Sequence, residues 1–73
     1  MTKEKGVLAE IYTIEQLQKI LKLSERTILR LLKNGKLTGF KAGREWRFQE
    51  SDINAYIQAQ RQEAEKERLL MQN

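Results

Sequence analysis

Cysteine and histidine are both absent from this chain of 73 residues. Without them the protein has no disulfide and no metal site of the Cys and His kind. Histidine, the most frequent general base, and cysteine, a common nucleophile, are therefore missing, and the acidic residues form no convergent set. We expect a protein that is not an enzyme and that needs no metal and no cofactor. The lack of cysteine also suits a reducing cytoplasm.

Long apolar runs are missing as well. No run approaches the roughly 18 residues of a membrane-spanning helix, and residues 1–10 show no signal-peptide pattern. A domain near this length buries only about 60% of the surface that its unfolded chain exposes, which leaves little room for an enclosed pocket. These features predict one soluble, cytoplasmic domain that does not act at a membrane.

Positive charge is in excess and is concentrated in the middle of the chain. The net charge is +4, from 14 Lys and Arg against 10 Asp and Glu. Between residues 22 and 47 eight cations stand against two glutamates, which makes that segment +6 and the remainder −2. The eight cations are Lys22, Arg26, Arg30, Lys33, Lys36, Lys41, Arg44 and Arg47. Such a segment is typical of a protein that binds a polyanion, although a solvated basic face kept for solubility predicts the same pattern.

Two short amphipathic helices are predicted in the first half of the chain. Thr13 caps the first, and Gln16 three residues later completes a capping box. Ser24 caps the second, and an Asn-Gly pair at 34–35 ends it in a left-handed conformation. Only residues 22–24 separate the two helices, so they must cross steeply, as in a helix-turn-helix. The apolar residues on their core-facing sides are Ile14, Leu17, Ile20, Leu21, Ile28, Leu31 and Leu32.

The second helix, residues 25–34, carries its cations on one side. At 100° per residue, Arg26, Arg30 and Lys33 fall in a narrow sector opposite the apolar residues. A helix in a DNA major groove requires such a stripe, because its first residues meet base edges while the cations reach guanine edges or phosphates. An exposed basic face without a ligand is the alternative. Helix surfaces usually mix charge signs and this one, after Glu25, does not, which favours nucleic acid.

A β-hairpin is predicted after the second helix, with strands over 37–42 and 46–48. A three-residue loop would pair Phe40 with Phe48 and gather the apolar side chains on one face. A two-residue loop would put Phe40 opposite Arg47 and divide the apolar set between the two faces. We therefore favour the three-residue loop.

The tip of this hairpin is basic. Arg44 projects from it, and the favoured register points Lys41 and Arg47 away from the packed face. An isolated hairpin is marginally stable in water, so it must pack on the helices and form a wing. Cations placed there can reach phosphates or the minor groove. Phe48 is expected in the core, whereas Trp46 suits either the core or the wing.

A third helix is predicted from Glu50, with Ile53 and Tyr56 facing the core. The apolar residues at 69–71 follow a stretch of mixed charge and could anchor a partner. The predicted division of the chain is a flexible arm at residues 1–10, a winged helix-turn-helix domain at 11–60 and a polar tail, helical or disordered, at 61–73.

Residues 12–58 resemble the excisionase-type, MerR-like winged helix-turn-helix DNA-binding domain. The resemblance rests on an ordered set of features rather than on one motif. These features are the caps at Thr13–Gln16 and Ser24–Thr27, the Gly-Lys-Leu at 35–37, the Gly-Arg wing tip at 43–44, the Trp-Arg-Phe at 46–48 and the Asp-Ile helix start at 52–53. The resemblance implies a mainly α fold with a small β-hairpin, in the order helix, turn, helix, hairpin wing, helix.

The same resemblance implies roles for individual residues. The second helix would enter the major groove and the hairpin would be the wing. Together with the cations identified above, the candidate DNA-binding residues are Ser24, Glu25, Arg26, Thr27, Arg30 and Lys33 on the recognition helix, and Thr13, Lys36, Lys41, Arg44 and Arg47 for the DNA backbone and the wing. Members of the family often carry Tyr or Trp where this chain has Leu29, so contact at that position would be apolar or absent.

The implied function is sequence-specific binding of double-stranded DNA at the bacterial nucleoid. Such modules serve as recombination directionality factors (excisionase-like) or as small transcriptional regulators. A domain of this size contacts few base pairs, so we expect self-association at repeated DNA sites, or a partner such as an integrase or RNA polymerase. The alternative is a protein-interaction module, an antitoxin or adaptor that retains the helix-turn-helix shape.

Overall fold

The computed structural model describes residues 10–72. The flexible arm predicted for residues 1–10 lies, apart from Glu10, outside the described residues. The elements in chain order are β1 (Ile11–Thr13), α2 (Ile14–Leu21), α3 (Glu25–Lys33), β2 (Phe40–Ala42), β3 (Glu45–Gln49) and α4 (Glu50–Leu70). The predicted fold class is confirmed, and the hairpin is part of a three-stranded antiparallel sheet.

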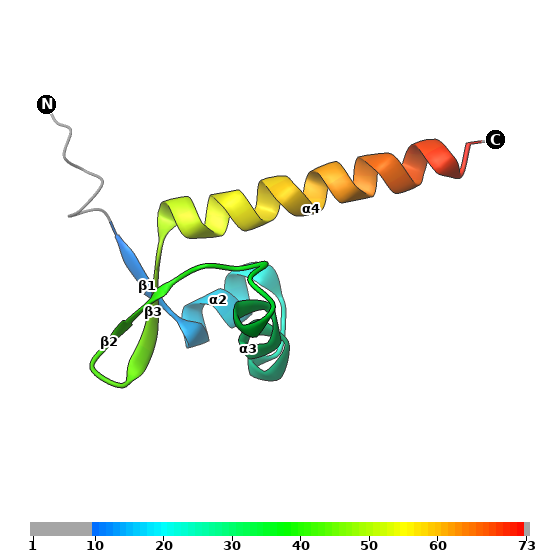
Figure 1. Cartoon of the computed structure of the whole chain (residues 1–73). Coiled ribbons are helices and arrows are strands. Elements are labelled where there is room, and N and C mark those ends of the chain that lie inside the picture. The colour runs from blue at the N-terminus through cyan, green and yellow to red at the C-terminus, as the bar shows by residue number, and fades with distance from the viewer. Residues whose placement is uncertain (1–9, 73) are drawn as a thin grey trace, which may run out of the picture.

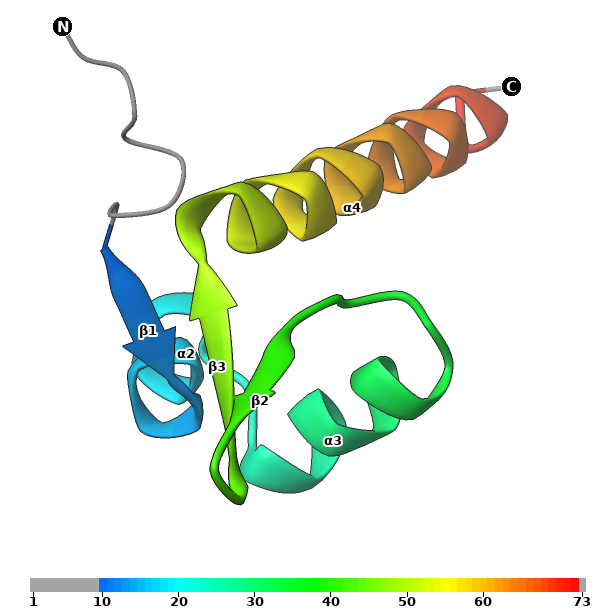
Figure 2. The same cartoon turned by 60° about the vertical axis from the view of Figure 1, so that its left-hand side comes forward.

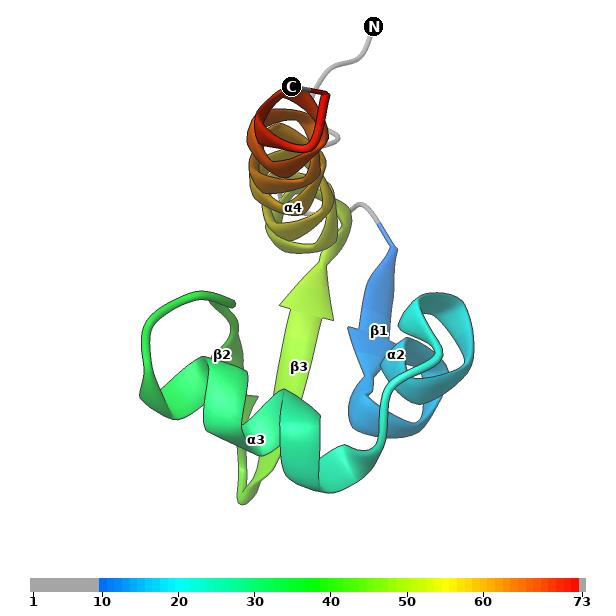
Figure 3. The same ribbon diagram turned by 90° about the vertical axis from the view of Figure 1, so that its right-hand side faces the viewer.

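The helices lie on two levels, which β3 connects. Helix α4 crosses the top of the view, α2 and α3 lie at the bottom, and β3 runs from one level to the other (Figures 1 and 3). The tip of the β2–β3 hairpin points to the same side as α3 (Figure 3). Helix α3 and the hairpin tip therefore share one face of the molecule, and α4 lies on the opposite face.

Local hydrogen bonds start the two short helices as predicted. The backbone N–H of Gln16 donates to Thr13 Oγ1 at 3.2 Å, and the N–H of Thr13 donates to Gln16 Oε1 at 2.9 Å, which completes the capping box. At α3 the N–H of Thr27 donates to Ser24 Oγ at 3.2 Å. These bonds satisfy amides that the first turn of a helix otherwise leaves without a partner.

The helix ends differ from each other. Helix α3 is followed by Gly35 with φ +79°, the left-handed stop that the sequence indicates. Helix α2 is followed by its C-cap residue Lys22, which adopts φ 59° and ψ 44° although it has a side chain. A left-handed conformation is strained for any residue other than glycine, so the steep helix-turn-helix corner stores some strain at Lys22.

Strand β1 was not predicted. Its residues were predicted only as the start of the domain and the cap of the first helix, but Tyr12 pairs with Phe48 and Thr13 with Arg47, which makes β3 the central strand in the order β1-β3-β2. The pairing attaches the start of the domain to the edge of β3 that does not pair with β2.

The predicted hairpin register is wrong. Phe40 pairs with Arg47 and Ala42 with Glu45, so the loop has two residues rather than three. Gly43, at the first loop position, has φ +69°, which fits the tight primed turns that match the twist of paired strands. Phe40 is consequently 39% exposed on the outer face of the sheet. Its place in the core is taken by Leu37, which lies before β2 and is 2% exposed.

The core consists of one side chain from each of the three helices, one from β3 and one from the connection before β2. Its buried members are Leu17, Ile28, Leu37, Phe48 and Ile53, and Phe48 is fully buried as predicted. Each such side chain contributes about 1.5–3 kcal/mol when it is fully buried, so this small cluster holds the elements together. Ile20 does not join it and is 46% exposed.

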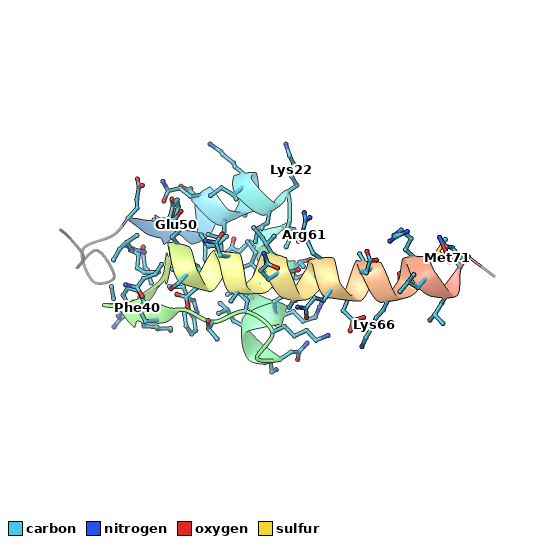
Figure 4. The ribbon with its side chains drawn as sticks, turned by 90° about the horizontal axis from the view of Figure 1, so that it is seen from above. Lys22, Phe40, Glu50, Arg61, Lys66 and Met71 are labelled. Carbon is cyan, nitrogen blue, oxygen red and sulfur yellow. The ribbon has the colours of Figure 1, made fainter. Side chains whose placement is uncertain are left out.

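Helix α4 is much longer than the body that it covers. At 1.5 Å per residue its 21 residues span about 32 Å. Its first turns contribute Ile53 to the core, whereas every residue from Gln58 to Leu70 is exposed. Figure 4 shows that the stretch from Lys66 to Met71 projects past the other described elements. No helix among the described residues has the length and apolar character needed to cross a membrane.

Candidate nucleic-acid interface

The exposed side of α3 is a stripe of three cations. Arg26, Arg30 and Lys33 are all exposed, and Ile28 on the opposite side of the helix is completely buried. Within residues 10–72, none of the three forms an ion pair with the protein. Their charge is therefore available to an external anion, and the burial of Ile28 fixes which side of the helix presents it.

The first turn of α3 combines satisfied hydroxyls with an unpaired carboxylate. Ser24 Oγ accepts the capping bond and donates to Thr27 Oγ1 at 3.1 Å, so both hydroxyls hold the helix start in place. Glu25 is exposed and makes no hydrogen bond or ion pair within the described residues. Leu29, one turn later, is 41% exposed and offers an apolar contact on the same helix.

The three cations of the wing lie in different environments. Arg44 sits at the exposed tip. Lys41 pairs with Trp46 across the hairpin, and its Nζ lies 5.4 Å from the centre of the indole ring. The expectation that Lys41 points away from the packed face is therefore wrong, because the two-residue loop places it on the same face as Trp46 and Phe48.

Arg47 points to the outer face but is held by its own strand. Its Nη1 lies 3.3 Å from Glu45 Oε1 and donates to the carbonyl oxygen of Trp46 at 3.0 Å. Its side chain is only 28% exposed, whereas that of Glu45 is 73% exposed. The ion pair reduces the field that Arg47 projects toward an incoming phosphate.

An open groove of about 480 Å³ separates α3 from the wing. Figure 2 shows the hairpin tip beside the start of α3. The apolar part of the lining includes Leu29 and Trp46, and the charged part comprises Glu15, Glu25, Glu45, Arg44 and Arg47. Because three carboxylates outnumber two guanidinium groups, the groove itself is a poor phosphate site. Phosphates fit better on the two sides of the groove, at the α3 stripe and at the wing tip.

The groove brings some predicted residues together and leaves others apart. Thr13 and Glu25 line it together with Arg44 and Arg47. Lys36 lies elsewhere, in a hollow beside α4 that Glu63 also lines. The sequence reasoning assigned no role to the groove residues Glu15 and Gln18, because the outward face of α2 carries no periodic signal that points across to the wing.

A family model described as a helix-turn-helix domain matches residues 11–61, from the first residue of β1 to the middle of α4. Comparison with curated proteins and with solved structures finds no match. The matched stretch contains α3, the wing and the groove between them. A helix-turn-helix domain indicates DNA as the partner.

Proposed function

The chain belongs to the excisionase-like helix-turn-helix domain family, and we propose that it is a sequence-specific double-stranded DNA-binding protein. Helix α3 reads the major groove, and the wing contacts the DNA backbone or the minor groove. The protein acts by binding rather than by catalysis, either as a recombination directionality factor or as a small transcriptional regulator.

The observation that carries this proposal is the unpaired cationic stripe of α3. Arg26, Arg30 and Lys33 lie opposite the buried Ile28, on the face toward which the wing tip also points. A solvated surface kept only for solubility gains nothing from placing its cations on one side of one helix. A DNA duplex, by contrast, can contact the α3 stripe and the wing tip at the same time.

The proposed contacts divide by chemistry. Guanidinium groups of Arg26 and Arg30 can bind guanine edges or phosphates, and Glu25 can accept a hydrogen bond from a cytosine amino group. Lys33 and the wing tip Arg44 serve as phosphate contacts that position the domain. Ser24, Thr27 and Thr13 hold the helix starts, and Lys36, Lys41 and Arg47 add to the positive field near the phosphates.

One domain cannot supply high specificity alone. Each mismatched base pair costs about 1–3 kcal/mol, and a domain of this size contacts only a few pairs. We therefore propose that several copies occupy repeated sites next to each other, or that an integrase or RNA polymerase binds alongside. DNase footprints that never extend beyond one short site at any protein concentration would contradict self-association on DNA.

A salt titration tests the central claim. Fluorescence anisotropy of a labelled random-sequence duplex is measured at several salt concentrations for the wild type, for Arg26→Ala/Arg30→Ala and for a control, Arg61→Ala/Lys66→Ala. The control removes the same charge from exposed positions of α4, outside the α3 stripe and the wing. We expect the slope of log affinity against log salt to become shallower by about 2 in the Arg26→Ala/Arg30→Ala variant only, because each lost phosphate contact contributes about 0.9 to its steepness.

The outcomes are distinct. Equal loss in both double variants would show that net charge, rather than the α3 stripe, attracts the duplex. Absence of binding by the folded wild type at low salt would overturn the proposed function. Selection of preferred sites from a random pool then tests sequence specificity.

One observation favours a second candidate function, a protein-interaction module of the antitoxin or adaptor type. Leu69, Leu70 and Met71 are 56%, 78% and 80% exposed at the projecting end of α4. A variant with all three changed to serine separates the two functions. Unchanged DNA affinity together with loss of biological activity would favour the interaction module.

A further inference from the structure

Residues 34–39 connect α3 to β2, and this connection decides where the wing stands relative to the recognition helix. The connection leaves α3 along a defined path, because the N–H groups of Lys36 and Leu37 both donate to the carbonyl oxygen of Leu31, at 2.9 and 3.3 Å. Leu37 then enters the core. The remaining freedom lies in Thr38 and Gly39, immediately before β2.

Thr38 is tied to the other end of the wing through Asp52. The Thr38 hydroxyl donates to Asp52 Oδ1 at 2.8 Å, and the backbone N–H of Gln49 donates to Asp52 Oδ2 at 3.0 Å. Thr38 precedes β2, Gln49 is the last residue of β3, and Asp52 lies in the first turn of α4. One half-buried carboxylate thus joins both ends of the hairpin to the start of α4.

Gly39 shows how little space the base of the wing leaves. A Cβ at this position would lie 2.8 Å from the carbonyl oxygen of Arg47 and 2.8 Å from ring atoms of Phe48. At the other end of the hairpin, a Cβ on Gly43 would meet nothing within 4 Å. The wing is therefore tightly held at its base and unsupported at its tip, so its direction is set at the base.

We propose that Thr38 and Asp52 are positioning residues for DNA binding, which fix the wing relative to α3 and thereby set the spacing between the major-groove contact and the wing contact. This inference rests on the proposed function. Neither side chain has to touch DNA. A hairpin with strands of three and five residues holds no fixed direction by itself, so a shift at its base moves Arg44 away from its phosphate.

The test compares Thr38→Val, which keeps the shape of the side chain without its hydroxyl, with Thr38→Ser, which keeps the hydroxyl. Ser51→Ala, at an exposed neighbour of Asp52, is the control. Asp52→Asn is a second variant, because its neutral amide removes the negative charge that strengthens both hydrogen bonds. Three readouts are used: affinity for a selected duplex, hydroxyl-radical footprints, and amide hydrogen exchange of β2 and β3 without DNA.

We expect the Thr38→Val and Asp52→Asn variants to bind DNA about three- to tenfold more weakly, because each loses hydrogen bonding to a charged group. Their footprints should lose protection on the wing side. The amide hydrogens of their hairpin should exchange faster than those of the wild type. Protection over the bases read by α3 remains. Thr38→Ser and Ser51→Ala should match the wild type. Circular dichroism confirms that each variant is folded.

Each contrary result has one meaning. Wild-type affinity and exchange in Thr38→Val would overturn the positioning role and leave the proposed function intact. Equal losses in Thr38→Val and Thr38→Ser would assign the effect to packing and would also overturn it. Failure of the wild type to bind DNA overturns the proposed function, and unaltered hairpin exchange in the variants would then refute the structural part of the inference separately.

Discussion

Gly39→Ala tests the tight base of the wing. The added methyl group would lie 2.8 Å from a backbone oxygen of Arg47 and from the ring of Phe48, which is completely buried. Carbon atoms pack best at about 3.5–4.0 Å, so β3 or the Phe48 ring must move by more than about half an ångström. Such overpacking costs about 1–3 kcal/mol, and the backbone atom cannot rotate away. We therefore place the loss at the upper end, about 2–3 kcal/mol.

Gly43→Ala is the matched comparison, because it adds the same methyl group for a different physical cost. Nothing lies within 4 Å of it, but Gly43 has φ +69°, which costs about 1 kcal/mol for a residue with a side chain. Thermal unfolding followed by circular dichroism should therefore place Gly39→Ala about 10–20 °C below the wild type and Gly43→Ala about 4–8 °C below it.

Urea unfolding provides the free energies, and the slopes with denaturant should agree among the three proteins because the exposed surface is nearly unchanged. A Gly39→Ala protein that loses less stability than Gly43→Ala would refute the argument from close packing.

Three further predictions concern other sites. Lys22→Gly should raise the free energy of unfolding by about 0.5–1 kcal/mol in urea, because the left-handed strain at φ 59° outweighs the added freedom of the unfolded chain; a lower stability would contradict the strain. Glu45→Gln should release Arg47 from its ion pair and make it available to a phosphate. The salt dependence of DNA binding in the anisotropy assay should then steepen by up to about one phosphate contact. An unchanged slope would show that Arg47 does not face the DNA. Burial, and to a lesser degree two nearby glutamates, raises the pKa of Tyr12 above 10.0, so its contribution to stability is complete below pH 10 and is lost as the pH rises through the folded pKa. Urea unfolding across that range should show a steeper decline for the wild type than for Tyr12→Phe, and parallel declines would remove Tyr12 as the cause.

The features that were predicted best from the sequence are those that depend on residues within four positions of each other. The capping box of Thr13 and Gln16 and the cap at Ser24 depend only on local spacing, and the structure contains both. The stripe of Arg26 and Arg30 follows from helical period alone, and the buried Ile28 on the opposite side confirms its orientation. The DNA contacts assigned to these cations stay predictions until the salt titration is done.

The sequence predicted poorly what depends on distant partners. Strand β1 forms because Tyr12 meets Phe48, 36 positions later, and three residues carry too short an alternation to reveal that pairing. The register failed because the rule of gathering apolar residues on one face assumed that Phe40 is buried. The core instead takes Leu37 from outside the strand, which leaves Phe40 exposed.

The candidate site shows the same division. Arg44 was placed correctly at the tip, because a turn is a local feature. The ion pair of Arg47 with Glu45 and the ring contact of Lys41 both depend on the register, so the error in the register carried over to them. The double role of Asp52 was also missed, because its link to Thr38 spans 14 positions.

The position of α4 opposite α3 has a practical consequence for attachments to this domain. The start of β1 and the end of α4 lie toward the side away from α3 and the wing tip (Figure 1). In the proposed orientation on DNA, a fluorescent protein or an enzyme fused at either end would be carried on the outer surface of the complex. The domain could therefore deliver a fused cargo to its site without placing that cargo between protein and duplex.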